Sequence, residues 1–394
     1  MIPFADALRL ILESAPPAGT ERIRIEDSVG RVLREPVSCD RPFPPFDRVM
    51  MDGIALRSRD VLLGFGDFLI TGAAAAGHEP PALPPAPGSC VEVMTGSPLP
   101  PGADCVVPVE ETMRLENGSI HLSGNANASP GRNIHPAGSD AQQGQTILSA
   151  GIRIGSRQIG AAASCGAAWL TVSKLPRIIV FATGDELAAV DDTPSIYQIR
   201  QSNAHAIRAA LWRAGYPVAR TDTLPDDPDA GKARIGAALA NCDWLILTGA
   251  VSKGARDFIP SALDGIGCER IFHGIAQRPG KPAGCWKHPS GTRIAALPGN
   301  PVSALTCLHA LVLPALEASV GLTNIAREMV RMDSSVRRLP DSTCHLPVTL
   351  RDGTAYPAPV ENSGDFTGLL RSDGFLTLPP AGTDTGVFPF TPWF

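Results

Sequence analysis

The feature that most constrains the fold is an alternation of apolar strands and helices between residues 174 and 320. Short runs rich in Val, Ile and Leu are typical of buried strands, and the longer segments between them carry apolar residues at helical spacing. This alternation predicts a parallel sheet covered by helices on both faces. The strands are expected at 177–182, 216–221, 244–248 and 292–297, and the helices at 204–214, 227–241 and from 301 onward.

The sequence on either side of this region has a different pattern. Between residues 42 and 142, short apolar runs are separated by turns rich in Gly and Pro, of which the whole chain holds 39 and 38. Regular turns of this kind predict a small all-β domain that is inserted into the chain. The same pattern at 325–394 predicts a C-terminal β-barrel. Residues 1–41 and 143–173 are expected to form a helical linker domain with an amphipathic opening helix.

Composition and charge exclude several classes of protein. The formal net charge of −5 gives no overall basic field that would attract nucleic acid or an anionic membrane. The longest apolar stretch, Pro301–Val320, contains a proline, a histidine and a glutamate, so we expect a buried helix rather than a membrane span. Nine scattered cysteines without a C-x-x-C pair, together with a start that does not resemble a signal peptide, predict a cytoplasmic protein.

Small and hydroxyl-bearing residues follow several strands of the predicted sheet. In such sheets the ligand binds beyond the carboxyl ends of the strands, so we expect these turns to meet at one edge. Glycines let backbone N–H groups approach an oxyanion closely, and helix N-termini add partial positive charge. The predicted binding residues are Thr183, Gly184, Ser202, Asn203, Thr248, Gly249, Ser252, Pro282, Pro298, Gly299, Asn300, Pro301 and Ser303.

Charged residues near the same edge narrow the chemistry. Arg278 and Lys281 suit an oxyanion, the arginine as a planar fork and the lysine as a point charge. Four acids, Asp185, Glu186, Asp227 and Asp257, would repel that anion unless a divalent cation such as Mg²⁺ lies between acids and phosphates. The acids could instead only cap helices, which is the better interpretation for Asp185 and Asp226. The three acids assigned to the metal are Glu186, Asp227 and Asp257.

Two longer blocks outside the predicted sheet are also distinctive. Pro44–Ala55 (PPFDRVMMDGIA) resembles the pattern P-x-F-x-x-S-x-M-D-G-Y-A, and Met94–Val107 resembles M-T-G-x-P-x-P followed by A-D-x-V-V. Together with the turns at 183–187, 200–203, 279–282 and 297–304, these blocks occur in the same order as in the MoeA/gephyrin E-domain family of molybdopterin molybdenumtransferases. The resemblance extends over residues 40 to 365, and the ordered set is far more specific than any one block.

The resemblance implies a fold and a reaction. It implies four domains, with a MogA-like molybdopterin-binding domain at 174–320, and an elongated homodimer. Adenylylated molybdopterin and molybdate would enter a cleft shared between subunits, where molybdate is inserted at the dithiolene sulfurs with Mg²⁺ and AMP is released. A MogA-type adenylyltransferase and recipient molybdoenzymes are the implied partners.

The resemblance also implies roles for individual residues. Ser363 matches a serine that the C-terminal domain turns toward the site, and Arg278 joins the substrate-binding set. The alternative for two of the catalytic positions is structural, with Thr95 as an ordinary turn hydroxyl and Asp52 as an Asx-turn residue. The implied catalytic residues are Asp52, Thr95, Asp140, Glu186, Asp257 and Lys281.

The sequence departs from the family pattern at several of these blocks. Arg278 replaces a lysine, and His135 replaces an arginine, which would make an oxyanion contact pH-dependent. Ala250 stands where the loop normally has a second glycine, so its Cβ would narrow the backbone approach or forbid a positive φ. These departures keep two other functions open: a non-catalytic molybdopterin carrier and an enzyme that adenylylates molybdopterin.

Overall fold

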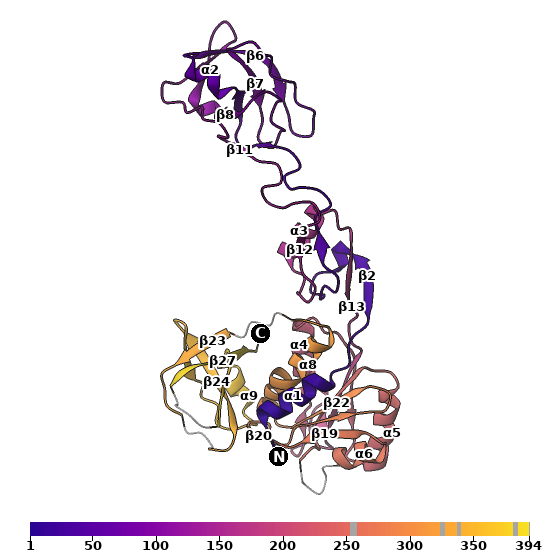
Figure 1. Ribbon diagram of the computed structural model, residues 1–394. Helices are drawn as coiled ribbons and strands as arrows, with labels where there is room; N and C mark the ends of the chain where they lie inside the picture. Colours follow the sequence, from indigo (N-terminus) through magenta and orange to yellow (C-terminus); the bar gives the residue numbers. More distant parts are fainter. Residues whose placement is uncertain (253–257, 324–327, 337–339, 381–384, 394) are drawn as a thin grey trace. The chain divides into compact units, whose positions relative to one another are not determined.

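The computed structural model describes all residues except 253–257, 324–327, 337–339, 381–384 and 394. The chain divides into two compact units (Figure 1). The first unit comprises Met1–Glu35, Ala150–Gly155 and Trp169–Phe394, and the second comprises Pro36–Ser149 and Ser156–Ala168. The sequence-based division into four domains with the boundaries given above stays a prediction.

A six-stranded sheet forms the centre of the first unit. Only β21 runs antiparallel to its neighbours, so the other five strands point the same way. This confirms the predicted α/β region, with β19 and β21 as additions that the sequence did not indicate. In spatial order the strands are β17 (Val218–Leu224), β14 (Ile178–Thr183), β18 (Trp244–Thr248), β22 (Arg293–Leu297), β21 (Gly284–Lys287) and β19 (Glu269–His273).

Helices cover both faces of this sheet, as predicted. Alternate residues of the buried strands point to opposite faces, so Val180 and Phe181 belong to two different hydrophobic clusters. One face packs on α1 (Phe4–Ser14), α4 (Asn203–Arg213) and the long helix formed by α7 (Pro301–Cys307), η3 (Leu308–Val312) and α8 (Leu313–Ser319). The other face packs on α5 (Pro228–Leu239) and α6 (Ile259–Gly265).

The long helix and α1 are both part of the core of this unit. The stretch Pro301–Ser319 is long and apolar enough to cross a membrane, but 78% of its most apolar window is buried inside the protein. This agrees with the predicted buried helix. Ala7 and Ile11 of α1 are also buried in the cluster that the long helix lines, so the opening helix packs on the α/β region.

The strand order creates a natural binding position. Along the chain β14 is followed by β17 on one side and then by β18 on the other, so the connections diverge between β14 and β18. At such a switch point the loops beyond the carboxyl ends turn away from each other and leave a crevice. The turns that end β14, β18 and β22 all lie at this edge.

A closed β-barrel follows in the C-terminal region, as predicted. Each of its strands pairs with two others, because β24 joins β26 as well as β25. On its other side β24 pairs with β20 (Ile275–Arg278), which pairs with β1 (Ile2–Pro3). A short helix, α9 (Phe366–Leu369), lies between two barrel strands. The barrel strands are β23 (Glu328–Met332), β24 (Thr343–Arg351), β25 (Thr354–Pro357), β26 (Gly374–Leu378) and β27 (Gly386–Pro392).

The second unit holds the predicted all-β region. Both faces of its main sheet are buried, with Ile54 and Leu56 in one cluster and Ala55 in another. Two-stranded pairs, β4 (Arg48–Val49) with β11 (Ile134–His135) and β3 (Val37–Ser38) with β12 (Thr146–Leu148), accompany α3 (Ser156–Ser164). The main sheet contains β8 (Cys105–Pro108), β5 (Gly53–Leu56), β7 (Ser89–Val93), β6 (Asp67–Ala74), β10 (Ile120–Leu122) and β9 (Thr112–Arg114).

Three minor pieces complete the described elements. In the first unit, β2 (Thr20–Arg24) pairs with β13 (Trp169–Ser173), and β15 (Leu187–Ala188) pairs with β16 (Ile199–Arg200). Because β15 begins directly after the turn that ends β14, this pair helps to shape the edge of the main sheet. The short helices η1 (Ile25–Asp27), η2 (Val109–Glu111) and α2 (Ser58–Leu62) lie in connecting segments.

Candidate functional site at the sheet edge

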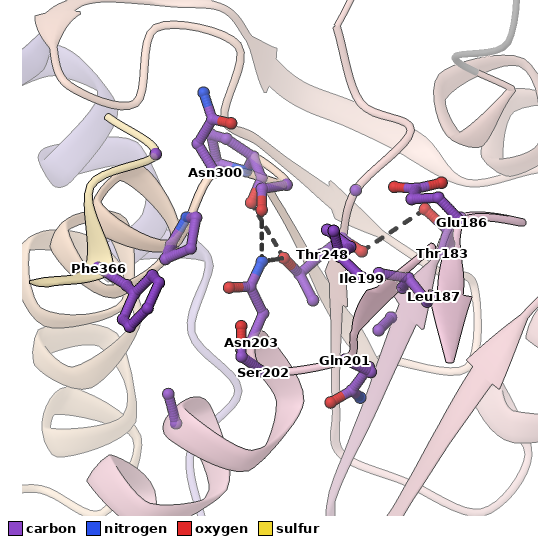
Figure 2. Close-up of a pocket in the computed structure, with 18 of the residues that line it drawn as sticks. Thr183, Glu186, Leu187, Ile199, Gln201, Ser202, Asn203, Thr248, Asn300 and Phe366 are labelled. Atoms are coloured by element: carbon purple, nitrogen blue, oxygen red, sulfur yellow. Dashed lines mark hydrogen bonds between the residues drawn. The ribbon is translucent and has the colours of Figure 1, made fainter. Parts of the chain in front are cut away.

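A cavity of about 1060 Å³ lies at the carboxyl edge of the sheet. Its walls come from the turns after β14, β18 and β22, from the start of α4, and from the segment around α9 (Figure 2). The structure therefore brings together most of the predicted binding turns. The predicted residues that line the cavity are Thr183, Gly184, Glu186, Ser202, Asn203, Thr248, Gly249, Ser252, Pro282, Pro298, Gly299, Asn300 and Pro301.

A hydrogen-bond network fixes three of these turns to one another. The Nδ2 atom of Asn203 donates to the carbonyl oxygen of Gly299 at 2.6 Å and lies 3.2 Å from Oγ1 of Thr248 (Figure 2). The Thr248 hydroxyl donates in turn to the carbonyl oxygen of Pro298 at 3.0 Å. Asn203 at the start of α4 thus ties the ends of β18 and β22, so the edge is preorganised before a ligand arrives.

Glycine is required at Gly249, where the chain passes close to β14. The residue has φ of +97°, and a Cβ there would lie 2.5 Å from the carbonyl oxygen of Thr183. The next residue, Ala250, also has a positive φ of +48° although it carries a Cβ. The departure from the family pattern at 250 therefore does not forbid the left-handed conformation; the chain adopts it with a strained alanine.

Among the described residues, two acids line the cavity, Glu186 and Asp226. The loops after β14 and β17 are tied together because the backbone N–H of Asp226 donates to Asp185 at 3.0 Å, with the reverse contact at 3.4 Å. Asp227 instead caps α5, since its Oδ1 accepts from the N–H groups of Asp229 and Ala230. The helix-cap interpretation therefore describes Asp227, and Asp226 faces the cavity.

The predicted metal set cannot be assembled from the described residues alone. Asp257 lies outside them, and no group of three or more His, Cys, Asp or Glu side chains placed to hold an ion occurs in the described part of the chain. Carboxylate oxygens are nevertheless the donors that Mg²⁺ prefers, so Glu186 and Asp226 fit a cation that is also held by ligand phosphates and water. The predicted roles of Asp227 and Asp257 stay predictions.

Of the two predicted cations, Arg278 is the last residue of β20, and Lys281 lies on the turn between β20 and β21. Both Arg278 and Lys281 are exposed, and among the described residues the cavity lining includes only their neighbour Pro282 from this turn. The turn is packed tightly on the long helix, because a Cβ at Gly280 would lie 2.3 Å from Sγ of Cys307. The backbone that carries Lys281 is thus well fixed, whereas its role stays a prediction.

Ser363 and Ser303 lie beside the cavity rather than on its lining. The Ser363 hydroxyl accepts a hydrogen bond from Nδ2 of Asn300 at 2.8 Å, and its carbonyl oxygen accepts from the N–H of Val302 at 3.1 Å. The C-terminal region therefore caps the first turn of α7, which lacks a side-chain cap of its own. Ser303 is buried within α7.

The remaining predicted catalytic residues lie in the second unit. Asp52 is exposed, and its Oδ1 accepts from both the N–H (2.6 Å) and the hydroxyl (2.7 Å) of Thr95. These two hydrogen bonds to the ionised form, the backbone bond first, lower the pKa of the Asp52 carboxyl below its usual value. The geometry is that of a carboxylate locked onto a turn.

His135 connects two charged residues of the second unit. Its Nδ1 lies 3.0 Å from Nη2 of Arg48, and its Nε2 lies 2.7 Å from Oδ1 of Asp140. Because a guanidinium can only donate, Nδ1 acts as the acceptor and Nε2 carries the proton toward Asp140. Both ring nitrogens are therefore used inside the protein, rather than left for the oxyanion contact that the sequence suggested.

Several cavity residues were not predicted as site residues. Asp226 was interpreted as a cap, and Gln201 lies in a recognised block but was not assigned a role. Gln201 is 7% exposed, and its Oε1 is a buried oxygen without a hydrogen-bond partner among the described residues. The resemblance directed attention to Ser363 in the C-terminal region, but the neighbouring residues that line the cavity were not predicted, since their placement depends on a tertiary contact. These residues are Gly364, Phe366, Leu369 and Leu370.

The fold and the site together define a class of protein. A mostly parallel sheet with glycine turns and two helix N-termini at its carboxyl edge, next to a closed β-barrel, is typical of an α/β protein that binds an anionic small molecule. Residues 2–166 match the family described as "MoeA N-terminal region (domain I and II)", and residues 179–318 match "Probable molybdopterin binding domain".

Individual relatives agree over the whole chain. A molybdopterin molybdenumtransferase of Synechocystis sp. is 36% identical, with 100% of both chains covered, and that of Bacillus subtilis is 30% identical over 97% of this chain and 86% of the relative. The crystal structure of a molybdopterin biosynthesis MoeA protein from Pyrococcus horikoshii covers 100% of this chain and 99% of its own, with 27% identity and a TM-score of 0.80. The chain belongs to the MoeA family of molybdopterin molybdenumtransferases.

Proposed function

We propose that this chain is a molybdopterin molybdenumtransferase, which inserts molybdate into adenylylated molybdopterin and releases AMP. The observation that carries the proposal is the cavity at the switch point of the sheet, in a chain whose full-length relatives bear this name. At about 1060 Å³ it reaches the upper end of the usual range for ligand sites, roughly 300–1,000 Å³, as a substrate that joins a pterin to a nucleotide requires.

The cavity offers two ways to hold the phosphates of such a substrate. The helices α4 and α7 both begin at the cavity, with Asn203 and Pro301 on its wall, and their first turns add partial positive charge. The turn at Gly249 brings backbone close to β14 without a side chain in between. These elements orient the substrate, and Lys281 and Arg278 are proposed to hold molybdate or phosphate from the neighbouring turn.

Mg²⁺ is proposed as the cation that offsets the repulsion between the carboxylates of the site and the phosphates of the substrate. When bound, it would neutralise phosphate charge and polarise the phosphoryl group, whose phosphorus is attacked by water when the adenylate is hydrolysed. Glu186 and Asp226 are the described carboxylates placed to hold it, and Asp227 and Asp257 are proposed further ligands on the strength of the family resemblance. Glu186 lies over the turn after β14, since a Cβ at Gly184 would meet its carboxylate at 2.5 Å.

The resemblance also underlies the proposed assembly. We propose a homodimer in which Asp52, Thr95 and Asp140 of one subunit contribute to catalysis in the cleft shared with the other. A MogA-type adenylyltransferase would supply the substrate, and molybdoenzymes would receive the product. The cytoplasm is the proposed location, because all nine cysteines are free thiols and eight of them are buried, which suits a reducing compartment.

A reconstitution assay tests the proposal. The purified chain is mixed with adenylylated molybdopterin, Mg²⁺ and molybdate, and AMP and active cofactor are measured. Release of AMP with formation of active cofactor supports insertion. Tight binding without AMP release would identify a carrier, and consumption of ATP with unmodified molybdopterin would identify an adenylyltransferase; either result overturns the proposal.

Neighbouring carboxylates supply matched variants for the same assay. We expect Glu186→Gln and Asp226→Asn to lower turnover at least about tenfold and to raise the Mg²⁺ concentration needed, because each removes a charged ligand. Asp227→Asn keeps the cap on α5, since an amide oxygen also accepts from backbone N–H groups. Because the cap stays intact, a loss of turnover in Asp227→Asn would support the proposed metal role of Asp227, whereas full activity in Asp226→Asn would remove Asp226 from the metal site.

A further inference from the structure

The segment around α9 presents an apolar surface to the cavity. Phe366 is 63% exposed and Leu370 is 84% exposed, although both line the cavity together with Leu369. Large apolar side chains that stay exposed inside a concave site are typical of a surface that a ligand covers. The polar turns of the sheet edge and this apolar wall therefore divide the cavity into two chemically different parts.

The apolar wall is fastened to the α/β region. Ser363 makes two hydrogen bonds to the beginning of α7, one to Asn300 and one to the N–H of Val302. Gly364 and Phe366 follow directly and line the cavity. The position of the wall is thus set by the same helix whose N-terminus lies at the phosphate-binding edge.

The turn that carries the aromatic ring is itself well ordered. Asp365 caps α9 by accepting from the N–H of Gly368 at 3.0 Å, and it also accepts from the hydroxyl of Thr367 at 2.7 Å and the N–H of Glu361 at 3.2 Å. A Cβ at Gly368 would lie 2.8 Å from Cγ2 of Val360, so the turn packs closely. A fixed backbone therefore presents the Phe366 ring to the cavity.

We propose that Phe366 is the stacking platform for a planar heterocycle of the substrate, either its adenine or its pterin. This inference rests on the proposed function. Figure 2 shows the ring on one side of the cavity and the polar residues Ser202 and Asn203, at the start of α4, on the other. A flat ring between them would stack its face on Phe366 and turn its polar edge toward the hydrogen-bonding groups. Phe366 then determines specificity, whereas the sheet edge holds the phosphates.

The test uses the full-length chain and three probes: AMP, neopterin and ribose 5-phosphate, which has no heterocycle. Isothermal titration calorimetry compares the wild type with Phe366→Ala. We expect the affinity for the stacked probe to fall about fivefold or more in Phe366→Ala, and that for ribose 5-phosphate to stay unchanged. Phe366→Tyr should keep the affinity, because it keeps the ring. Tyr356→Ala is the matched control, since Tyr356 is an exposed barrel aromatic that does not line the cavity.

The outcomes distinguish adenine from pterin as the stacked ring, and they distinguish a failure of the stacking role from a failure of the proposed reaction. A loss confined to AMP assigns the platform to adenine, and a loss confined to neopterin assigns it to the pterin. Equal affinities in Phe366→Ala and Tyr356→Ala for both probes, or no binding of either probe by the wild type, would overturn the inference. If the chain releases AMP in the reconstitution assay but Phe366→Ala binds AMP and neopterin as the wild type does, only the stacking role of Phe366 is refuted. If no AMP is released but the affinity for AMP or neopterin depends on Phe366, the stacking role stands and only the proposed reaction is refuted.

Discussion

The two regions that carry predicted functional residues are built in different ways. At the sheet edge of the first unit, backbone turns present the polar groups. Gly249 and Ala250 have positive φ angles, and glycine is needed at Gly249, where the chain passes close to β14. In the second unit, side chains hold one another, as Thr95 holds Asp52 and as His135 links Arg48 to Asp140.

This difference shows which kind of change each region tolerates. A site made of backbone conformation is sensitive to the addition of a single Cβ, because the whole turn must move. A site made of paired side chains keeps its backbone when one partner is replaced, and only the charge state or orientation of the other partner changes.

Gly249→Ala should be the most damaging of these changes. The new Cβ would lie 2.5 Å from the carbonyl oxygen of Thr183, in a residue with φ of +97°. We expect a loss of about 2–4 kcal/mol in the free energy of unfolding, from steric overlap added to the cost of the left-handed conformation. Urea unfolding followed by circular dichroism measures the loss.

Gly299→Ala is the control for that change. Gly299 lines the same cavity, but a Cβ there would meet nothing closer than Cα of Gly249 at 3.5 Å, which is ordinary contact. We expect the free energy of unfolding to change by less than about 1 kcal/mol. Equal losses in the two variants would show that the edge does not depend on the close approach at Gly249.

Sequence reasoning recovered the parts of this site that follow from local pattern. The turn residues could be predicted because the carboxyl ends of parallel strands must meet at one edge, and β18 agrees with its predicted bounds residue for residue. The closed barrel also follows from regular turns and short strands. The predicted and observed elements agree where the sequence has a regular strand or turn pattern.

The parts that were missed depend on tertiary contacts between distant segments. The resemblance turned Ser363 toward the site, but nothing in the local sequence indicated that Phe366 lines the cavity, because this placement arises when Ser363 bonds to Asn300, 63 residues earlier in the chain. Asp226 and Asp227 are adjacent acids, and only the direction in which α5 begins decides which one caps it. Strands β19, β21 and β23 were also missed, since strands of four or five residues give a weak periodic signal.

Ala250→Gly tests the same contrast by removing a Cβ from a left-handed residue instead of adding one. Ala250 holds φ of +48°, which costs an alanine roughly 1 kcal/mol but costs glycine little. The gain is reduced because glycine also adds freedom to the unfolded chain, so we expect a rise of up to about 1 kcal/mol in the free energy of unfolding. Ala206→Gly, on the wall of the same cavity but inside α4, should instead lose about 0.5–1 kcal/mol. A loss in Ala250→Gly would mean that the Cβ packs more favourably than the strain costs.

The smallest expected effect concerns the side-chain pair of the second unit. Thr95→Val removes the hydroxyl that donates to Asp52 and leaves the backbone N–H bond in place. The pKa of Asp52 is lowered mainly by that N–H bond and further by the hydroxyl, so it should rise part of the way toward the ordinary value of 3.8. Carbon-13 NMR of labelled aspartate carboxyls, assigned with Asp52→Asn, follows the titration.

The sign of this shift decides what the pair contributes. Because the folded pKa of Asp52 is lowered, its stabilising effect is present above the unfolded value and is lost as the pH falls through the folded pKa. In Thr95→Val the loss should begin at the same pH, since the unfolded pKa is unchanged, but it should be smaller and complete at a higher pH, while the fold at neutral pH stays intact. Thr112→Val is the control, since its hydroxyl donates to the carbonyl oxygen of Val109 and not to a carboxylate. An unchanged Asp52 titration in Thr95→Val would mean that the backbone turn alone sets the charge, and the two regions would then be built on the same principle.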